Sequence, residues 1–220
     1  MHSTLVNLNE IQKKIQLKSQ EQESLFKLPK IIAVSKTHTM ENILPLINYG
    51  HLDFGENKVQ EALEKWAEVK HSNKNIKLHL IGKLQTNKVK IAVKIFDYIH
   101  SLDSEKLANK ISNEQVNQKK KIKIFIQINI GNENQKSGIT KKNILEFYQY
   151  CKKLNLDVIG IMCIPPKEGN AQNYFIEMNK INKELNLLEL SMGMSEDYIE
   201  AAINHSTFIR IGSKIFGKRN

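Results

Sequence analysis

The feature that most constrains this 220-residue sequence is a regular alternation between short apolar runs and longer amphipathic segments. The short runs are rich in β-branched residues, and several are apolar almost throughout, as strands covered on both faces must be. Such alternation is typical of βαβ units, which build a parallel sheet. The runs predict eight strands, at residues 30–35, 51–55, 77–82, 97–102, 123–130, 156–164, 187–192 and 207–212.

The segments between these runs carry apolar residues three or four positions apart, which predicts helices packed on the sheet. Val59 and Trp66 have this spacing after the second run, and Phe175 and Met178 have it after the sixth. An amphipathic segment at residues 5–15 predicts one extra helix before the first strand.

Eight strands with intervening or flanking helices favour a closed (β/α)8 barrel of the TIM type over an open doubly wound α/β sheet. An open dinucleotide-binding sheet would require a glycine-rich turn after the first strand, and the residues there are Ser-Lys-Thr-His at 35–38. The length is near the lower end for one such barrel. We therefore expect residues 1–220 to form a single domain.

The formal net charge of +10 raises the question of an acidic partner. Only Arg210 and Arg219 are arginines among the 33 basic residues, whereas specific nucleic-acid readers rely on arginine for bidentate contacts. The densest basic run, at 119–123, precedes an expected strand and is typical of a solvated loop. Nucleic acid is therefore not the expected partner.

The sequence shows no sign of a membrane segment or an oxidising compartment. No window approaches the roughly 18 apolar residues of a membrane span, and the N-terminus lacks an apolar stretch behind a basic head. Cys151 and Cys163 stand apart in apolar surroundings and predict buried thiols. A cytoplasmic location is the expectation.

In a barrel of this type the functional groups lie at the C-terminal ends of the strands. Lys36 directly follows the first expected strand, whose residues 31–34 are apolar. Desolvation at the mouth of a barrel lowers the pKa of a lysine and frees its amine to attack a carbonyl. Position alone is weak evidence for a Schiff base, since 31 of the 33 basic residues are lysines.

The loops after the seventh and eighth strands are candidates for phosphate binding, which barrels often place there. They carry Ser191, Gly193 and Ser195 in one loop and Gly212 and Ser213 in the other. Glycine lets backbone N–H groups approach an anion, and serine adds a hydroxyl donor. Ordinary capped turns are the alternative interpretation.

Other reactive residue types offer weaker signals. The seven histidines show no metal-ligand spacing, so no metal site is expected, and His79 and His100 are interpreted as hydrogen-bonded strand residues. No G-x-S-x-G elbow supports a serine hydrolase. Met162, Met192 and Met194 are candidates to line a pocket.

Eight motifs in order give the sequence a resemblance to a known family. The motifs are IIAVSKTH (31–38), FGENKVQE (54–61), HLIGKLQTNK (79–88), HSLD (100–103), QINIGNENQKSG (127–138), GIMCIPP (160–166), LSMGMSEDYIEAAI (190–203) and IRIGSKIFGKR (209–219). With these motifs the sequence resembles the pyridoxal phosphate homeostasis protein family, single-domain relatives of the alanine racemase barrel, over nearly its whole length.

The resemblance implies that pyridoxal 5′-phosphate (PLP) is the cofactor and that Lys36, at the family's A-V-S-K position, carries it as a Schiff base. It likewise implies a phosphate cup formed by Ser195, Gly212 and Ser213.

Two further residues match positions that line the cofactor ring or its phosphate. These are Asn57 and Arg210, whose individual contacts the resemblance does not assign. A cation near the pyridine nitrogen would disfavour protonation of that nitrogen and weaken the cofactor as an electron sink.

The leading functional hypothesis is a PLP-binding protein of intracellular cofactor homeostasis, which binds, buffers or delivers PLP to PLP-dependent apoenzymes without efficient turnover. The alternative is a PLP-dependent racemase or related amino-acid enzyme, which needs a second proton-transfer group opposite the cofactor. In alanine racemases that group comes with a C-terminal β-domain and a dimer partner. This sequence ends eight residues after Gly212, so a monomer without efficient catalysis is expected.

Overall fold

The computed structural model of the protein describes residues 2–21, 27–133 and 135–217. Asn134, within the 127–138 motif, lies outside the described residues. The same holds for residues 218–219, at the end of the last motif, and so for Arg219.

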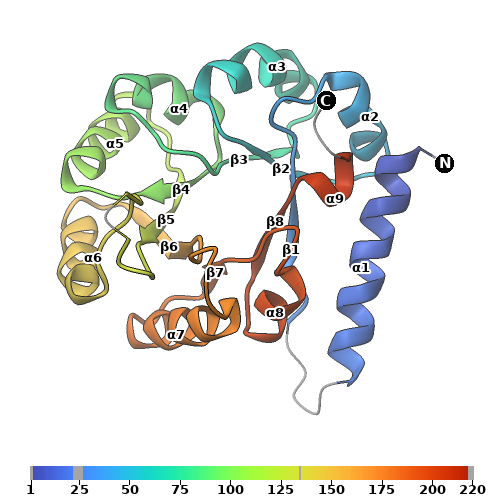
Figure 1. The fold of residues 1–220 in the computed structure, drawn as a ribbon. Helices are drawn as coiled ribbons and strands as arrows, with labels where there is room; N and C mark the ends of the chain where they lie inside the picture. Colours follow the sequence, from blue (N-terminus) through green and yellow to red (C-terminus); the bar gives the residue numbers. More distant parts are fainter. Residues whose placement is uncertain (1, 22–26, 134, 218–220) are drawn as a thin grey trace.

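The fold is a closed barrel of eight parallel strands in sequence order, which confirms the predicted (β/α)8 architecture (Figure 1). β1 pairs with β2 on one side and with β8 on the other, and this second pairing closes the sheet. Every strand overlaps the range predicted for it. The strands are β1 (Lys30–Val34), β2 (Asp53–Glu56), β3 (Lys77–Leu80), β4 (Tyr98–Leu102), β5 (Lys123–Ile128), β6 (Asp157–Cys163), β7 (Glu189–Ser191) and β8 (Phe208–Ile211).

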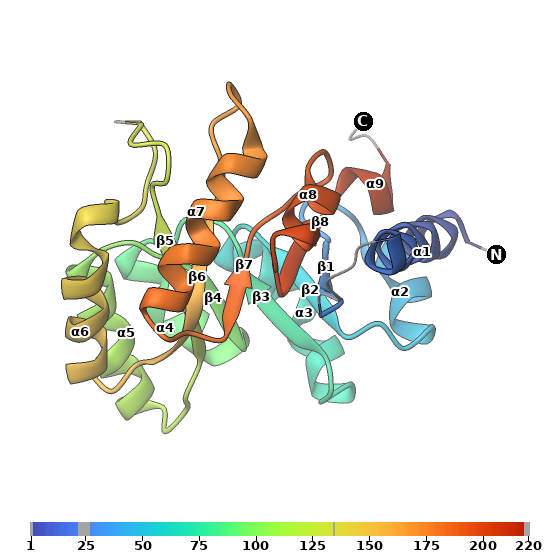
Figure 2. The same ribbon diagram turned by 90° about the horizontal axis from the view of Figure 1, so that it is seen from below.

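Helices surround the strands on the outside of the barrel, as the views in Figures 1 and 2 show. Short 3-10 turns precede α4 and α6. The helices and turns are α1 (Ser3–Glu21), α2 (Met40–Asn48), α3 (Val59–Ser72), η1 (Thr86–Lys88), α4 (Val89–Ile95), α5 (Glu105–Asn117), η2 (Lys141–Asn143), α6 (Ile144–Lys153), α7 (Ala171–Glu184), α8 (Tyr198–Ile203) and α9 (Ser213–Phe216).

The alternation of side chains along each strand divides the core into two parts. On β1, Ile31 and Ala33 point outward into the core between sheet and helices, whereas Ile32 points into the barrel. Ile32 packs there with a small apolar cluster that fills the interior. The other buried members of the cluster are Tyr98, Phe125, Met162 and Phe208. The barrel is therefore a packed core and not a channel.

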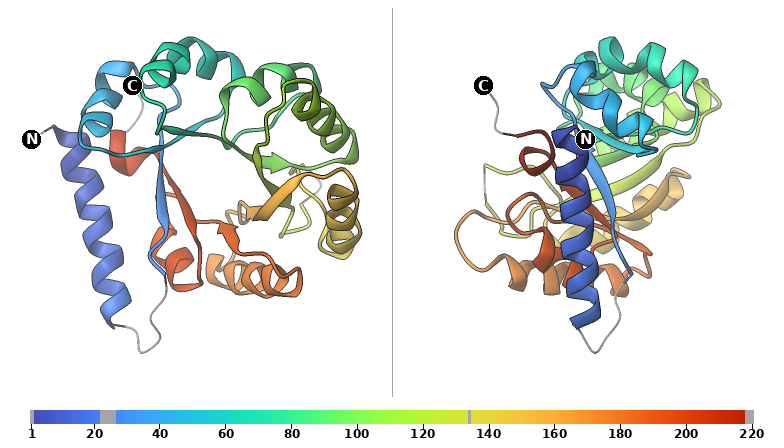
Figure 3. Two further views of the ribbon diagram at one scale, coloured as in Figure 1. Left: turned by 180° about the vertical axis from the view of Figure 1, so that it is seen from behind. Right: turned by 90° about the vertical axis from the view of Figure 1, so that its right-hand side faces the viewer.

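The extra N-terminal helix is present as α1, which packs against α2, α8 and α9 (Figure 3). Its buried apolar face consists of Leu8, Ile11 and Ile15. Asn7 Nδ2 donates a hydrogen bond to the carbonyl oxygen of Ile215 at 2.9 Å and so ties α1 to α9. Among the described helices, none is both long and apolar enough to cross a membrane.

Both cysteines are free thiols buried in the core, as predicted. Burial raises the pKa of Cys151 and that of Cys163 to about 12. Their thiols are therefore protonated at neutral pH and behave as small apolar groups.

Candidate functional site

A cavity of about 360 Å³ opens at the C-terminal ends of the strands. We call it the C-terminal pocket. Six of the eight predicted site residues line it: Lys36, Asn57, Ser195, Arg210, Gly212 and Ser213. These residues come from both halves of the sequence, and closure of the barrel between β1 and β8 brings them together.

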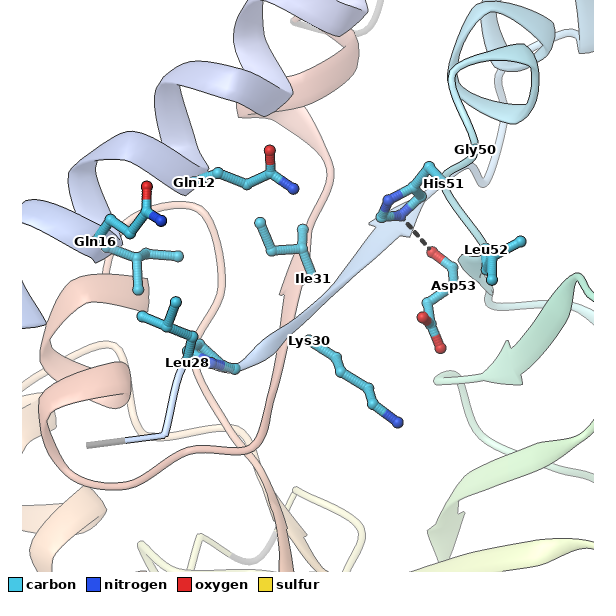
Figure 4. A pocket seen from close by; sticks show the side chains of 11 residues that line it. Gln12, Gln16, Leu28, Lys30, Ile31, Gly50, His51, Leu52 and Asp53 are labelled. Atoms are coloured by element: carbon cyan, nitrogen blue, oxygen red, sulfur yellow. Dashed lines mark hydrogen bonds between the residues drawn. The ribbon is translucent and has the colours of Figure 1, made fainter. Parts of the chain in front are cut away.

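A second cavity, of about 530 Å³, lies at the opposite end of the barrel, between α1 and the starts of β1 and β2 (Figure 4). We call it the N-terminal pocket. It is the larger of the two, but none of the predicted site residues lines it. The residues predicted to carry the chemistry therefore lie at the smaller, C-terminal pocket.

The backbone after Lys36 is held in an unusual conformation. Thr37 has a φ of 65°, in the left-handed region that β-branched residues rarely adopt. Its N–H donates a hydrogen bond to Glu61 Oε1 at 2.5 Å, and the same carboxylate oxygen pairs with Lys65 Nζ at 3.0 Å. A charge-assisted bond to the Thr37 backbone thus stabilises the turn that presents Lys36 to the pocket.

Glu61 is suited to this role because its carboxylate is stabilised in the charged form. Burial alone would raise the pKa of Glu61, but the Thr37 N–H and the Lys65 ammonium outweigh it and lower the pKa. The hydrogen-bond acceptor for Thr37 therefore stays ionised at neutral pH.

The residues predicted to form a phosphate cup lie in the loops after β7 and β8. The hydroxyls of Ser195 and Ser213 are 3.0 Å apart, so the two predicted donors lie side by side at the rim. Gly212 directly follows β8 and lies next to Val34 of β1. A Cβ at Gly212 would lie 3.5 Å from Val34 Cβ, an ordinary contact, so crowding is not the reason for glycine here.

Ser191 and Gly193, which were also predicted to bind the cofactor, do not line the C-terminal pocket. They form hydrogen bonds with Arg210 instead. Ser191 is fully buried, and its Oγ accepts a hydrogen bond from Arg210 Nη1 at 2.7 Å. The carbonyl oxygen of Gly193 accepts the Arg210 backbone N–H at 3.0 Å. Gly193 has a φ of +91°, and a Cβ there would lie 2.5 Å from Ala201 Cβ. Its conformation and close packing require glycine.

Arg210 is 5% exposed and brings a buried cation to the pocket. Besides the bond to Ser191, its Nη2 donates to the carbonyl oxygen of Cys163 at 2.9 Å. Burial lowers the pKa of Arg210, but a guanidinium stays protonated in proteins. Two neutral acceptors on different strands therefore fix the direction of this charge.

Asn57 follows β2 and is positioned by the neighbouring strand. Gly82, just after β3, lies so close that a Cβ there would be 2.4 Å from the Asn57 carbonyl oxygen. Any larger residue at 82 would displace the Asn57 backbone from the pocket wall.

The structure adds residues that the sequence analysis did not single out. His38 and Asp197 line the pocket. The His38 ring stacks on Phe216 of α9 with centroids 4.7 Å apart. Asp197 Oδ1 accepts the backbone N–H of Met194 at 2.6 Å and shapes the loop after β7. His38 lies in the 31–38 motif and Asp197 in the 190–203 motif, and this membership is the sequence signal that could have identified them.

The structure tests the predictions made for three methionines and two histidines. Met194 lines the pocket as predicted, whereas Met162 and Met192 are fully buried elsewhere. His79 and His100 are hydrogen-bonded residues of β3 and β4, which confirms their interpretation. Within the part of the chain that the structure describes, no three His, Cys, Asp or Glu residues cluster in a way that could hold a metal ion.

Comparison with known proteins agrees with this architecture. A family model described as alanine racemase, N-terminal domain, matches residues 6–220. The pyridoxal phosphate homeostasis protein of Haemophilus influenzae is 36% identical over an alignment of 225 positions. The alignment covers 97% of this chain and 95% of that protein.

Solved structures give the same result. PipY of Synechococcus elongatus, solved with PLP bound, has a TM-score of 0.80 and 32% identity, over 93% of this chain and 98% of that one. Alanine racemase of Clostridium difficile has a TM-score of 0.72 and 15% identity, over 99% of this chain and 57% of that one, and this likeness shows the fold alone. The chain therefore belongs to the pyridoxal phosphate homeostasis protein family, which shares its barrel with the N-terminal domain of alanine racemase.

Proposed function

We propose that this protein binds PLP in the C-terminal pocket, with Lys36 as the covalent anchor, and serves intracellular PLP homeostasis. The observation that carries the proposal is one cavity that joins Lys36, in the turn after β1, with Ser195, Gly212 and Ser213 of the loops after β7 and β8. The similarity to pyridoxal phosphate homeostasis proteins and to PipY, which was solved with PLP bound, supports it.

The residues of the pocket fit the groups of PLP. The Lys36 amine matches the aldehyde, and the paired hydroxyls of Ser195 and Ser213 match the phosphate. In the proposed linkage, Lys36 Nζ attacks the aldehyde carbon, a C=N bond forms, and the aldehyde oxygen leaves as water with two hydrogens from the amine. When bound, PLP supplies an electrophilic aldehyde and an electron-withdrawing ring.

Several other residues hold the site in place. Glu61 fixes the backbone beside Lys36, and Ser191 with the Cys163 carbonyl fixes Arg210. Where Arg210 faces the ring nitrogen, its charge disfavours protonation of that nitrogen and so weakens the ring as an electron sink. This supports storage or delivery of PLP, with PLP-dependent apoenzymes as the proposed recipients.

An amino-acid racemase is the competing function, because the family model that matches the chain is that of the alanine racemase N-terminal domain. The two functions are distinguished by supplying the PLP-loaded protein with L-alanine or with an apoenzyme that requires PLP. Homeostasis predicts that the apoenzyme gains activity while the alanine keeps its configuration. Rapid racemisation with a catalytic turnover of many alanine molecules per protein would contradict the proposal.

We also propose that residues 1–220 act as a single domain and that the protein is a cytoplasmic monomer. Two buried free thiols are compatible with a reducing compartment. Light scattering at micromolar concentration is expected to give the mass of one chain, 25.4 kDa. A stable dimer would contradict the monomer.

A further inference from the structure

Five polar side chains form a continuous hydrogen-bonded row through the inside of the barrel. We call this row the interior chain, and its members are Arg210, Ser191, His100, His79 and Asp53. Arg210 Nη1 lies 2.7 Å from Ser191 Oγ, which lies 2.9 Å from His100 Nδ1. His100 Nε2 lies 3.0 Å from His79 Nδ1, and His79 Nε2 lies 3.0 Å from Asp53 Oδ1.

The interior chain connects the two ends of the barrel. Arg210 lines the C-terminal pocket, and Asp53 lines the N-terminal pocket, where its side chain is 20% exposed. Lys30 and His51 line the N-terminal pocket beside Asp53, and His51 Nε2 is bonded to the Asp53 carbonyl oxygen at 2.9 Å (Figure 4).

The two histidines of the interior chain are held rigidly. Both are fully buried. The His79 ring stacks on Tyr98 with centroids 4.2 Å apart, and the His100 ring stacks on Phe125 with centroids 4.3 Å apart. Because each ring is packed against an aromatic side chain in the closed interior, it cannot turn, and each ring nitrogen stays with one hydrogen-bond partner.

Elementary donor and acceptor rules assign a direction to every bond. An ionised Asp53 can only accept, so His79 must donate its Nε2–H, and a neutral His79 then has a bare Nδ1. That Nδ1 accepts the Nε2–H of His100, whose own Nδ1 is bare. Ser191 donates its O–H to this Nδ1, and its oxygen accepts the N–H of Arg210.

The charge states required for this direction fit the surroundings. Burial lowers the pKa of His79 and lowers that of His100 well below its ordinary value, so both rings are neutral at pH 7. Burial would raise the pKa of Asp53, but the hydrogen bond from His79 and the charge of nearby Lys30 act against burial, and the pKa is lowered.

The opposite direction would leave buried polar groups without partners. If His100 carried its proton on Nδ1, Ser191 Oγ would accept from both His100 and Arg210, and its O–H would need another acceptor in a fully buried site. In addition, His79 would have to carry its proton on Nδ1 and face the Asp53 carboxylate with a lone pair. Both arrangements cost free energy.

We infer that Asp53, His79 and His100 are positioning residues, which act through Ser191 to hold the Arg210 guanidinium in place at the C-terminal pocket. The Asp53 carboxylate sets the proton positions of both His79 and His100, although of these two rings it is bonded only to His79. The consequence for PLP affinity rests on the proposed function, whereas the proton positions do not.

The test is ¹⁵N NMR of the histidine rings in the PLP-free protein at neutral pH, with signals assigned from the variants His79→Gln and His100→Gln. Both rings are expected as Nε2–H tautomers. In Asp53→Leu the acceptor is gone, and both His79 and His100 are expected to populate the Nδ1–H tautomer. If Asp53→Leu does not fold, Asp53→Ala takes its place, because a methyl group likewise offers no acceptor to His79.

A matched control and a second readout separate this inference from the proposed function. Asp157→Leu removes an exposed carboxylate at the same end of the barrel and is expected to leave both tautomers unchanged. Loss of the Asp53 acceptor is expected to weaken PLP binding about fivefold, the effect of one hydrogen bond, whereas Asp157→Leu leaves it unchanged.

Two results would overturn the inference. One is an Nδ1–H tautomer on either ring of the wild-type protein, and the other is a His100 tautomer that does not respond to replacement of Asp53. Failure of the wild-type protein to bind PLP would instead overturn the proposed function, and the tautomers would still decide the inference.

Discussion

Single side chains at the C-terminal pocket are held by specific bonds: Arg210 donates to Ser191 Oγ and to the Cys163 carbonyl oxygen, and the Thr37 N–H donates to Glu61. These bonds join segments that lie far apart in the sequence, so no local pattern could predict them. Lys36, Ser195, Gly212 and Ser213 were predictable, because strand-end positions and family motifs both pointed to them. Ser191 was placed in the same group. It instead lies one layer deeper, because side-chain direction at the end of β7 depends on how that short strand pairs with its neighbours.

A first prediction concerns Ser195. Replacing Ser195 with Ala removes a hydroxyl that pairs with Ser213 at the pocket rim. Loss of one charge-assisted hydrogen bond should weaken PLP binding by about 1.5–3 kcal/mol. Equilibrium titration with PLP measures this. Ser72→Ala, at the exposed end of α3, serves as the control and should bind like wild type. Equal affinities for the two variants would remove Ser195 from the site.

At the scale of strands and helices, hydrophobic periodicity predicted every strand and the extra helix α1. The ends of the strands were predicted less accurately. β2 ends at Glu56, one residue beyond its predicted end, and β7 is only three residues long. A strand ends where its hydrogen-bonded neighbours end, and that information lies in distant parts of the chain. Periodicity within a segment cannot supply it.

The helix α1 offers a prediction with a control in the same helix. Leu8 is 1% exposed against the barrel, whereas Leu17 is 48% exposed. Leu8→Ala should lower the free energy of unfolding by about 2–5 kcal/mol, since it leaves a cavity in the core. Leu17→Ala should change it by less than about 0.5 kcal/mol. Urea unfolding measures both, and equal losses would mean that α1 does not pack as described.

For the whole molecule, buried histidines make stability depend on pH. Burial lowers the pKa of His51, His79 and His100 below the ordinary 6.5. The unfolded chain therefore binds more protons than the fold as pH falls below 6.5, and stability is lost in that direction. Each such group contributes a slope of up to about 1.4 kcal/mol per pH unit.

Urea unfolding between pH 7.5 and 5.5 tests this dependence. The free energy of unfolding should decline below pH 6.5 in the wild-type protein. The decline should be shallower in His100→Gln, and unchanged in His71→Gln, since His71 is exposed on α3. Stability that is constant or rises as the pH falls would contradict the burial of neutral histidines.

The proposed function of the whole molecule depends on Lys36 as the covalent anchor of PLP. The direct measurement is borohydride reduction of the PLP-loaded protein, followed by proteolysis and mass spectrometry of every lysine peptide. We predict that the reduced pyridoxyl group is found on Lys36, and that Lys36→Ala carries none at the same PLP concentration. Labelling of another lysine with Lys36 left unmodified would contradict the account.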